Sequence, residues 1–421
     1  MKIIADLHIH SPYARAVSKQ MTLENLDMWA RMKGITVMGT GDFTHPQWMK
    51  EIKSQLEPAE KGLYRIRNQA LGMRNGGTRF LLTVEISSIY SKGGKTRRIH
   101  NLIFAPSIET AEKINKVLGF MGNIKSDGRP ILGLDAKELA KIVFDIDPTC
   151  MLVPAHAWTP WFSVFGSMSG FNSLEECFDE YAKYIYAIET GLSSDPEMNW
   201  RVSMLDDIAL ISNSDSHSLQ RIGREANVLD CPLSYNGIMS AIKSHDPKRF
   251  LFTVEFFPEE GKYHYDGHRA CEFSCGPDET KKLNNLCKNC GKRMTIGVMN
   301  RIAALADRPA GKKHAYAIPF KRMVTLDTII AESFGMGVGS QKVKTAYHAM
   351  INSLGTEFGI LIDAKMSDIA SAATPEIVEA ITRVREGRLS IIPGYDGEYG
   401  TVKIFSTNER VGKSAQRSLF M

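Results

Sequence analysis

Hydrophobic and polar residues follow two repeating patterns over the first 230 residues of the chain. Short apolar runs rich in β-branched residues favour strands. Seven such runs are present: Lys2–His8, Thr36–Thr40, Phe80–Ile86, Ile99–Ala105, Cys150–Ala155, Tyr184–Glu189 and Ala209–Ser212. Stretches with the period of a helix lie between several of them: Leu23–Lys33, Ala111–Leu118, Ala136–Val143 and Leu174–Lys183. Strands that alternate with helices predict parallel pairing in an α/β fold, and seven strands suit a closed or nearly closed barrel.

The pattern changes after about residue 230. Residues 260–292 are polar, contain glycine and cysteine, and show no regular period. Helical periodicity then returns in Ile296–Ala306, Thr325–Phe334, Lys342–Leu354 and Pro375–Glu386. The tract Gly335–Gly339 lacks the spacing of a phosphate-binding loop and predicts a turn between two helices. We therefore expect an α/β barrel over residues 1–235, a small module over 260–295, a mainly helical domain over 296–400 and a tail over 401–421.

Composition and charge are those of an ordinary globular protein, with 43% hydrophobic and 24% charged residues. No apolar run approaches the roughly 18 residues of a membrane span. The N-terminus meets charged residues at once and has no long apolar signal core, so a cytoplasmic location without a membrane partner is expected. The net charge of +5 is compatible with a phosphate-bearing partner.

Histidine, aspartate and glutamate residues gather at the predicted strand ends. His8 and His10 are two residues apart at the end of the first strand, so their side chains project to the same side. Asp215 and His217 repeat this spacing after the seventh strand. The strands between them contribute Asp42, Glu85, His100, His156 and Glu189. The carboxyl ends of parallel strands form the active-site face of such folds, so these side chains should meet.

These residue types together predict a metal centre, although His100 by itself would more often be structural. Buried imidazoles and carboxylates at one end of successive strands would be costly without metals or mutual pairing. Such ligands suit zinc, manganese or iron. We expect two divalent ions, with zinc, manganese and magnesium as candidates and Glu85 between them. Two ions close together suit in-line attack of water on phosphorus, and we find no serine or cysteine nucleophile motif.

Four of the seven cysteines form two close pairs, Cys271 with Cys275 and Cys287 with Cys290. Two pairs separated by a short loop match one structural zinc ion, and reactive or disulfide-bonded cysteines are the alternative. His268, just before the first pair, could compete as a ligand. A closed four-cysteine site leaves no position for catalysis, so its expected role is to hold this segment folded.

The segments Asp6–His10 and Asp215–His217, with the glutamate and histidine residues between them, resemble the PHP (polymerase and histidinol phosphatase) superfamily. The resemblance implies a distorted seven-stranded (β/α) barrel with a two- or three-metal centre. Gly39–Pro46, His156–Phe162 and the cysteine module are, in addition, similar to endonuclease Q. That family joins a PHP domain to a zinc module and a helical C-terminal region. It nicks DNA on the 5′ side of deaminated bases (uracil, hypoxanthine, xanthine) and of abasic sites.

The resemblance also implies roles for individual residues. One ion would be held by His8, His10, Glu85 and Asp215, and the second by Glu85, His100 and His156. Arg15 and Phe43 stand near the places of two ligands of a third ion, which argues against that ion. The expected catalytic residues are Asp215, His217, Arg15 and Asp42. Among them, Arg15 could contact the scissile phosphate as a fixed charge, and His217 could protonate the departing oxygen.

The segment Trp158–Phe171 follows His156 and is rich in aromatic and small residues. A nuclease that inspects one base usually flips the nucleotide into a pocket, where aromatic rings could stack and hydroxyls could read the base edge. A hydrophobic lid over the barrel is the alternative. The candidate lesion-contacting residues are Trp158, Trp161, Phe165, Ser169, Gly170, Phe171 and, beyond the sixth strand, Ser193.

These features favour a metal-dependent endonuclease for damaged DNA, double- or single-stranded, over two alternatives. A small-molecule phosphatase of the histidinol-phosphatase type would use the same metals but would hardly need the residues after 230. A non-catalytic DNA-binding module would tolerate loss of several ligands, whereas the ligand set is nearly complete. The C-terminal residues Gln416, Leu419 and Phe420 resemble the start of a sliding-clamp-binding peptide, and chance is the alternative.

Overall fold

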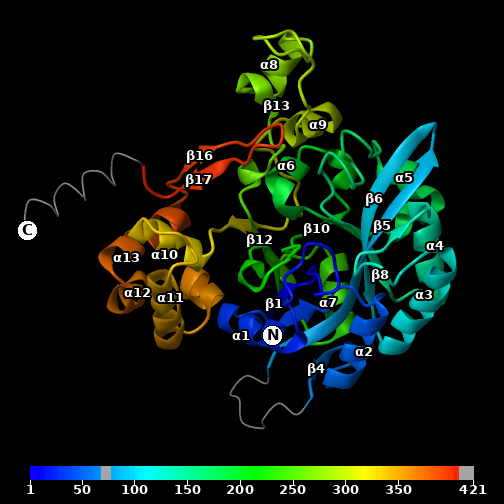
Figure 1. The fold of residues 1–421 in the computed structure, drawn as a ribbon, viewed down its shortest axis with the longest axis horizontal. Coiled ribbons are helices and arrows are strands. Elements are labelled where there is room, and N and C mark those ends of the chain that lie inside the picture. The colour runs from blue at the N-terminus through cyan, green and yellow to red at the C-terminus, as the bar shows by residue number, and fades with distance from the viewer. Residues whose placement is uncertain (68–76, 407–421) are drawn as a thin grey trace, which may run out of the picture.

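The computed structural model describes residues 1–67 and 77–406, which form a mixed α/β body with a small cysteine-containing module and a group of C-terminal helices (Figure 1). The main sheet runs in the order β15-β12-β11-β1-β2-β5-β4-β3. The strands along this order are β1 (Lys2–Asp6), β2 (Val37–Gly39), β3 (Leu56–Pro58), β4 (Tyr64–Ile66), β5 (Arg79–Lys92), β11 (Ala226–Asp230), β12 (Phe250–Glu255) and β15 (Phe320–Arg322). Three further strands belong to the same sheet off this path: β6 (Lys95–Ala105), β8 (Met151–Pro154) and the short β7 (Ile131–Leu132), which pairs with β5. The sheet therefore continues beyond residue 235, since β12 and β15 extend it past β11.

All seven predicted strands form, but their pairing is not uniformly parallel. β1, β2 and β5 pair in parallel. By contrast, β5 pairs antiparallel with β6 (Lys95–Ala105), which pairs antiparallel with β8 (Met151–Pro154). The reason is a tight hairpin at Gly93–Gly94, whose φ angles of 61° and 72° suit the two-residue turns that reverse a strand. β9 (Ala187–Glu189) and β10 (Ala209–Ile211) form a separate parallel pair, so the described strands do not close into one hydrogen-bonded ring.

The helices of the first 245 residues surround this sheet. They are α1 (Leu23–Lys33), α2 (Pro46–Gln55), α3 (Ile108–Met121), α4 (Ala136–Ile146), α5 (Leu174–Phe178), α6 (Pro196–Asn199) and α7 (Tyr235–Lys243). α1 has the predicted bounds because Thr22 caps its first turn and Gly34, at φ 90°, ends it in the left-handed region. The predicted helix over 174–183 is divided, because α5 is followed by a 3₁₀ helix over Asp179–Tyr184.

The C-terminal helices gather on one side of the body in Figure 1. They are α10 (Leu326–Phe334), α11 (Gln341–Leu354), α12 (Met366–Ala372) and α13 (Pro375–Glu386). The turn predicted after α10 is confirmed, since Gly335 adopts φ 64° and caps the helix. A buried ion pair joins this unit to α1, with Lys33 Nζ 3.3 Å from Glu357 Oε2. The same carboxylate accepts hydrogen bonds from Tyr347 and from the backbone N–H of Leu326, so no polar group of the contact is left unpaired.

The small cysteine-containing module stands apart at the top of Figure 1. It comprises β13 (Asp266–His268), β14 (Phe273–Cys275) and α8 (Pro277–Lys282), and leads into α9 (Val298–Leu305). The hairpin of β16 (Ser390–Ile392) and β17 (Thr401–Lys403) lies between this module and the C-terminal helices. Gln416, Leu419 and Phe420 of the clamp-like segment lie outside the described residues. No helix in the described part of the chain is long and apolar enough to span a membrane.

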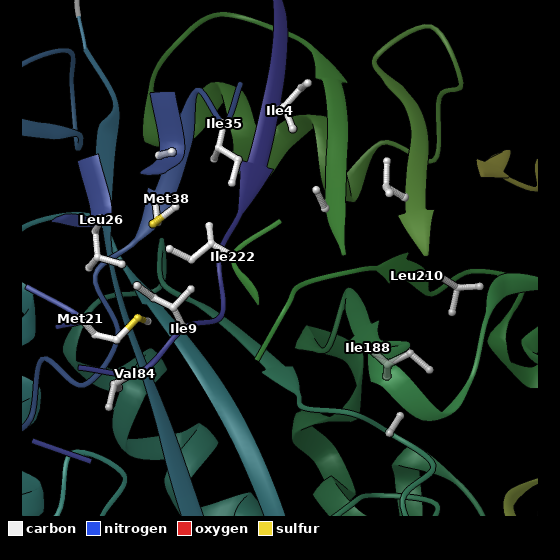
Figure 2. Close-up of a cluster of buried hydrophobic side chains, with 14 of the residues drawn as sticks. Ile4, Ile9, Met21, Leu26, Ile35, Met38, Val84, Ile188, Leu210 and Ile222 are labelled. Atoms are coloured by element: carbon white, nitrogen blue, oxygen red, sulfur yellow. The ribbon is translucent and has the colours of Figure 1, made fainter. Parts of the chain in front are cut away.

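The hydrophobic core fixes the strand ends that carry the candidate ligands. Figure 2 shows Ile9 among a cluster that includes Met21, Leu26, Met38 and Ile222. Ile9 is 1% exposed and points into this cluster, so its neighbours His8 and His10 must point to the opposite side. The alternation of apolar and polar residues in this segment thus fixes the direction of the His8 and His10 imidazoles.

Candidate metal centre and cleft

Glu85 lies between two pairs of histidines at one end of the sheet. Its Oε2 is 3.4 Å from His10 Nε2 and 3.8 Å from His8 Nε2. Its Oε1 is 2.7 Å from His100 Nδ1 and 3.0 Å from His156 Nε2. Each histidine pair forms with Glu85 a group whose ligand atoms lie within 4.8 Å of one another. The two oxygens of this one carboxylate therefore face two different groups of candidate ligands.

Asp215 and His217 close the other side of the cluster. Asp215 Oδ1 is 3.1 Å from His10 Nε2 and 3.6 Å from His8 Nε2. His217, His10 and Asp215 make a further group of the same size. Asp215 and His156 adopt left-handed backbone angles, with φ of 45° and 29°. Non-glycine residues adopt such angles at an energetic cost, and they concentrate at functional sites.

Two buried carboxylates accept contacts from His8 and His10, which follow β1, on the side away from Glu85. Glu189 places both oxygens 3.1 Å from His8 Nδ1, and Asp42 Oδ1 is 3.0 Å from His10 Nδ1. Such partners orient an imidazole so that its other nitrogen can bind a metal. Asp42, which we expected to be catalytic, is fully buried beneath His10 and also accepts a bond from the Ser11 N–H. The structure therefore places it as a support for His10.

The cluster has the chemistry that divalent cations require. His8 Nε2 is buried and has no hydrogen-bond partner, although it faces the other ligand atoms. Burial alone would raise the pKa of the Asp215 carboxyl, but His8 and His10 hold that pKa well below its ordinary value. Burial also lowers the pKa of His100 to about 4, so its imidazole is neutral. Against the effect of burial, neighbouring carboxylates raise the pKa of His8, His10 and His156, so a metal ion that binds these imidazoles would displace protons from them.

A cleft of about 1200 Å³ opens directly above these ligands. Arg15 lines it and is exposed, as expected for a residue that meets substrate. Arg129 also lines it, with Nη1 3.2 Å from Glu85 Oε2. Sequence reasoning missed Arg129, because residues 122–130 carry no periodic pattern and no motif. The Gly128 that precedes it lies so close to Asp42 that a Cβ would be 2.3 Å from the carboxylate, which marks this loop as part of the site.

Two of the seven candidate lesion-contacting residues, Trp161 and Ser193, line the cleft. The other five do not. Trp158 and Phe165 are fully buried, and the indole N–H of Trp158 donates to Asn199. Phe171 is buried under the Arg97 guanidinium, the Ser169 hydroxyl donates to the Arg98 carbonyl, and Gly170 packs against Gly166. These five residues form the packed interior of the loop, as the hydrophobic-lid alternative predicts.

Aromatic residues that the sequence did not single out complete the far wall of the cleft. Tyr263 meets Trp161 edge-on, with ring centroids 5.4 Å apart. Tyr399 is 71% exposed and carries Lys262 Nζ 4.5 Å from its ring centroid. The cleft is lined by Trp161, Lys262, Tyr263 and Tyr399. Tyr263 lies just before β13 of the cysteine-containing module, and Tyr399 lies in the loop between β16 and β17. No local pattern could have indicated this meeting of distant segments.

The cysteine module brings together His268, Cys271, Cys287 and Cys290, whose ligand atoms lie within 4.8 Å of one another. Cys275, which we expected as a ligand, lies outside this group and its Sγ is 3.2 Å from Thr280 Oγ1. It is buried on β14 and faces α8. His268 takes the fourth position, with Nδ1 3.5 Å from Cys290 Sγ. Three thiolates and one imidazole are an ordinary tetrahedral zinc set.

Two solved structures of endonuclease Q are similar to this chain over nearly its whole length. The structure is similar to the crystal structure of the lesion-specific endonuclease PfuEndoQ from Pyrococcus furiosus, with a TM-score of 0.84 and 30% identity over 98% of this chain and 99% of that one. It is also similar to endonuclease Q in complex with a 27-mer duplex substrate carrying an abasic lesion at the active site, with a TM-score of 0.83 and 32% identity over 96% and 97% of the two chains.

Two further comparisons concern the sequence. The uncharacterized protein YqxK of Bacillus subtilis is 32% identical over 96% of this chain and 99% of its own length. The family model of the MJ0043 C-terminal domain matches residues 325–388, the segment that contains α10 to α13.

Proposed function

The chain belongs to the endonuclease Q family, and from this premise we propose that it is a metal-dependent endodeoxyribonuclease of DNA repair. Its expected reaction is hydrolysis of the phosphodiester bond 5′ to a damaged nucleotide. The observation that carries the proposal is the position of Glu85, with one oxygen toward each histidine pair at the floor of a nucleotide-sized cleft.

We assign one ion to His8, His10, Glu85 and Asp215, and a second to Glu85, His100 and His156. Bound divalent ions would activate a water molecule and neutralise charge on the phosphoryl oxygens. Glu189 and Asp42 keep the imidazoles of His8 and His10 oriented toward the ions. His217 lies in a group with His10 and Asp215, and its Nδ1 is 2.9 Å from the Asp215 carbonyl oxygen. We propose His217 as the proton donor to the departing oxygen, a role that requires a second proton on Nε2, since a carbonyl can only accept the proton on Nδ1.

Arg15 and Arg129 supply positive charge at the mouth of the centre. Arg129 already neutralises part of the Glu85 charge, and Arg15 has an exposed side chain that lines the cleft. Guanidinium groups bind phosphate oxygens through paired N–H donors. We propose that Arg15 binds the scissile phosphate and that Arg129 keeps the Glu85 carboxylate fixed during turnover.

We propose deaminated bases (uracil, hypoxanthine and xanthine) and abasic sites as the lesions. The cleft volume of about 1200 Å³ exceeds the roughly 300–1,000 Å³ of typical ligand pockets, which supports a substrate larger than a small phosphate monoester. Trp161 and Tyr263 offer aromatic surface for a base or for the exposed sugar of an abasic nucleotide. For the structural zinc ion we propose His268, Cys271, Cys287 and Cys290 as the ligands.

The test is a cleavage assay on labelled duplexes that carry one uracil, one hypoxanthine, one abasic site or no lesion, with Mg²⁺ or Mn²⁺ supplied. We expect one nick per damaged strand and none in intact DNA. Asp215→Asn and EDTA are the controls that should abolish cutting. Hydrolysis of small phosphate monoesters without any DNA cleavage would instead support the phosphatase alternative.

A further inference from the structure

Arg224 is a largely buried arginine in the cleft that forms no ion pair with a carboxylate within 4.0 Å among the described residues. Its Nε donates to the Ser214 carbonyl at 2.9 Å, and its Nη2 lies 3.5 Å from the carbonyl oxygen of the metal ligand Asp215. The side chain lines the cleft, as does the exposed Arg221 on the same turn. A buried charge without a counter-ion is costly unless a ligand supplies one.

The chain holds this guanidinium in a fixed position. Gly223, just before it, adopts φ 68°, and its N–H donates to Asp6 Oδ2 at 2.9 Å. The other Asp6 oxygen accepts the Ser214 N–H at 3.0 Å. A side chain at Gly223 would approach Ile35 Cδ1 to 2.9 Å, so the turn has no room to shift toward the core. Asp6, which is fully buried, thus ties the turn that carries Arg224 to the loop that carries Asp215.

Burial lowers the pKa of Arg224, and the attraction of Asp215 and Glu225 offsets this only in part, since no carboxylate of the described residues lies within 4.0 Å of its guanidinium. Glu225 points away from the cleft and accepts the Phe256 N–H through Oε1. Burial raises the pKa of Glu260, the acidic residue beside Arg221 and Arg224 in the cleft, to about 7, so much of it is uncharged near neutral pH. Asp215 is committed to the metal centre. Two of the five N–H donors of Arg224 reach backbone carbonyls, and the others are free for a ligand.

We propose that Arg224, assisted by Arg221, is a second phosphate subsite that binds the DNA phosphate next to the scissile one. The inference rests on the proposed function, because it needs a DNA strand whose scissile phosphate lies on the metal centre. Since Arg224 and Asp215 are fixed to each other through Asp6, the subsite sets the distance between the gripped phosphate and the cut. Arg224 is a positioning residue in this account, and it fixes the register of cleavage.

Binding measured in EDTA tests the subsite without metal or turnover. The probe is a set of abasic duplexes in which a single phosphate near the lesion is replaced by a neutral methylphosphonate. For the wild-type protein, one replacement beside the scissile position should weaken binding about 10-fold, which is the size of one charge-assisted contact. Arg224→Gln should weaken binding to unmodified DNA by a similar factor and lose sensitivity to that replacement alone. Its slope of log K against log salt concentration should also fall by about 0.9.

Arg65→Gln is the matched control, because Arg65 on β4 pairs with Glu57 on β3 and does not line the cleft. It should keep the wild-type profile. The subsite is overturned if Arg224→Gln keeps full sensitivity at every phosphate, or if it lowers cleavage while DNA binding and salt slope stay wild-type. Arg224→Met serves if the glutamine variant does not fold, and an unchanged profile in that variant also overturns the subsite. Failure of the wild-type protein to bind any abasic duplex would refute the proposed function itself.

Discussion

His8 Nδ1 lies 3.1 Å from both carboxylate oxygens of Glu189, and this contact turns His8 Nε2 toward Glu85 and Asp215. Glu189 is fully buried, and its Oε2 also accepts the backbone N–H of His156 at 2.8 Å. One carboxylate therefore supports a ligand of each predicted ion without facing either ion itself. Such support is the usual way in which a protein fixes imidazoles at a metal.

Glu189→Gln should lower the affinity of the centre for divalent metal by about 10- to 100-fold, because His8 loses the charge that orients it. Metal titration followed by calorimetry measures the change, and excess Mn²⁺ should restore part of the activity. Glu176→Gln, at an exposed glutamate outside the cleft, is the control. Wild-type metal affinity in the Glu189 variant would show that the contact is only structural.

The proposed zinc site includes His268 and excludes Cys275, and this difference can be tested. His268→Ala and Cys290→Ser should release zinc from the module, whereas Cys275→Ser should retain it because its Sγ faces Thr280. Zinc content measured on the purified full-length variants decides between them. Loss of zinc from Cys275→Ser, with retention in His268→Ala, would restore the four-cysteine site that the spacing alone suggested.

The buried carboxyl of Glu255 should make the stability of the fold depend on pH. Burial, with Asp195 and Glu225 nearby, raises its pKa to about 8, against the hydrogen bonds from Thr253 and Thr190 that lower it. The unfolded chain ionises this carboxyl near 4.5, so stability is lost as pH rises from about 4.5 to about 8. The free energy of unfolding of Glu255→Gln should therefore rise relative to that of the wild type over this window, by at most about 1.4 kcal/mol per pH unit. Denaturant unfolding at pH 5 and pH 8 measures it, and a constant difference between the two proteins would refute the prediction.

Trp158 and Trp161 should respond oppositely to alanine. Trp158 is fully buried with its N–H bonded to Asn199, so its replacement should cost about 3–5 kcal/mol of stability. Trp161 lines the cleft and meets Tyr263, so its replacement should weaken binding of damaged duplex with little effect on the melting temperature. Melting curves and duplex-binding curves for the two variants form the test. Equal loss of stability in both would place Trp161 in the core as well.

The meeting of the candidate ligands was predictable because an extended segment imposes strict alternation of its side chains. Ile9 enters the core, so His8 and His10 had to share the other face, and the same spacing applied to Asp215 and His217. The antiparallel pairing of β5 and β6 was missed, although Gly93–Gly94 is a hairpin signal. The alternation of strands and helices elsewhere in residues 1–230 favoured parallel pairing, and the glycine pair was not interpreted as a turn.

Other parts of the site depend on contacts that no local pattern records. Arg129 and Arg224 lie in loops, and only the folded chain brings them beside Glu85 and Asp215. Aromatic content alone could not tell that Trp161 faces the cleft while Trp158 and Phe165 face the core. Cys275 fitted the spacing of a zinc ligand, but its place on β14 directs the thiol to Thr280.

The most direct test of the account is the position of the cut in an abasic duplex. The damaged strand is labelled at one end, digested with the metal-loaded enzyme, and resolved at single-nucleotide steps beside a size ladder. We predict one cut, at the phosphodiester immediately 5′ of the abasic site, which disappears in EDTA and in Asp215→Asn. A cut on the 3′ side, cuts spread along undamaged sequence, or cleavage that persists in Asp215→Asn would contradict it.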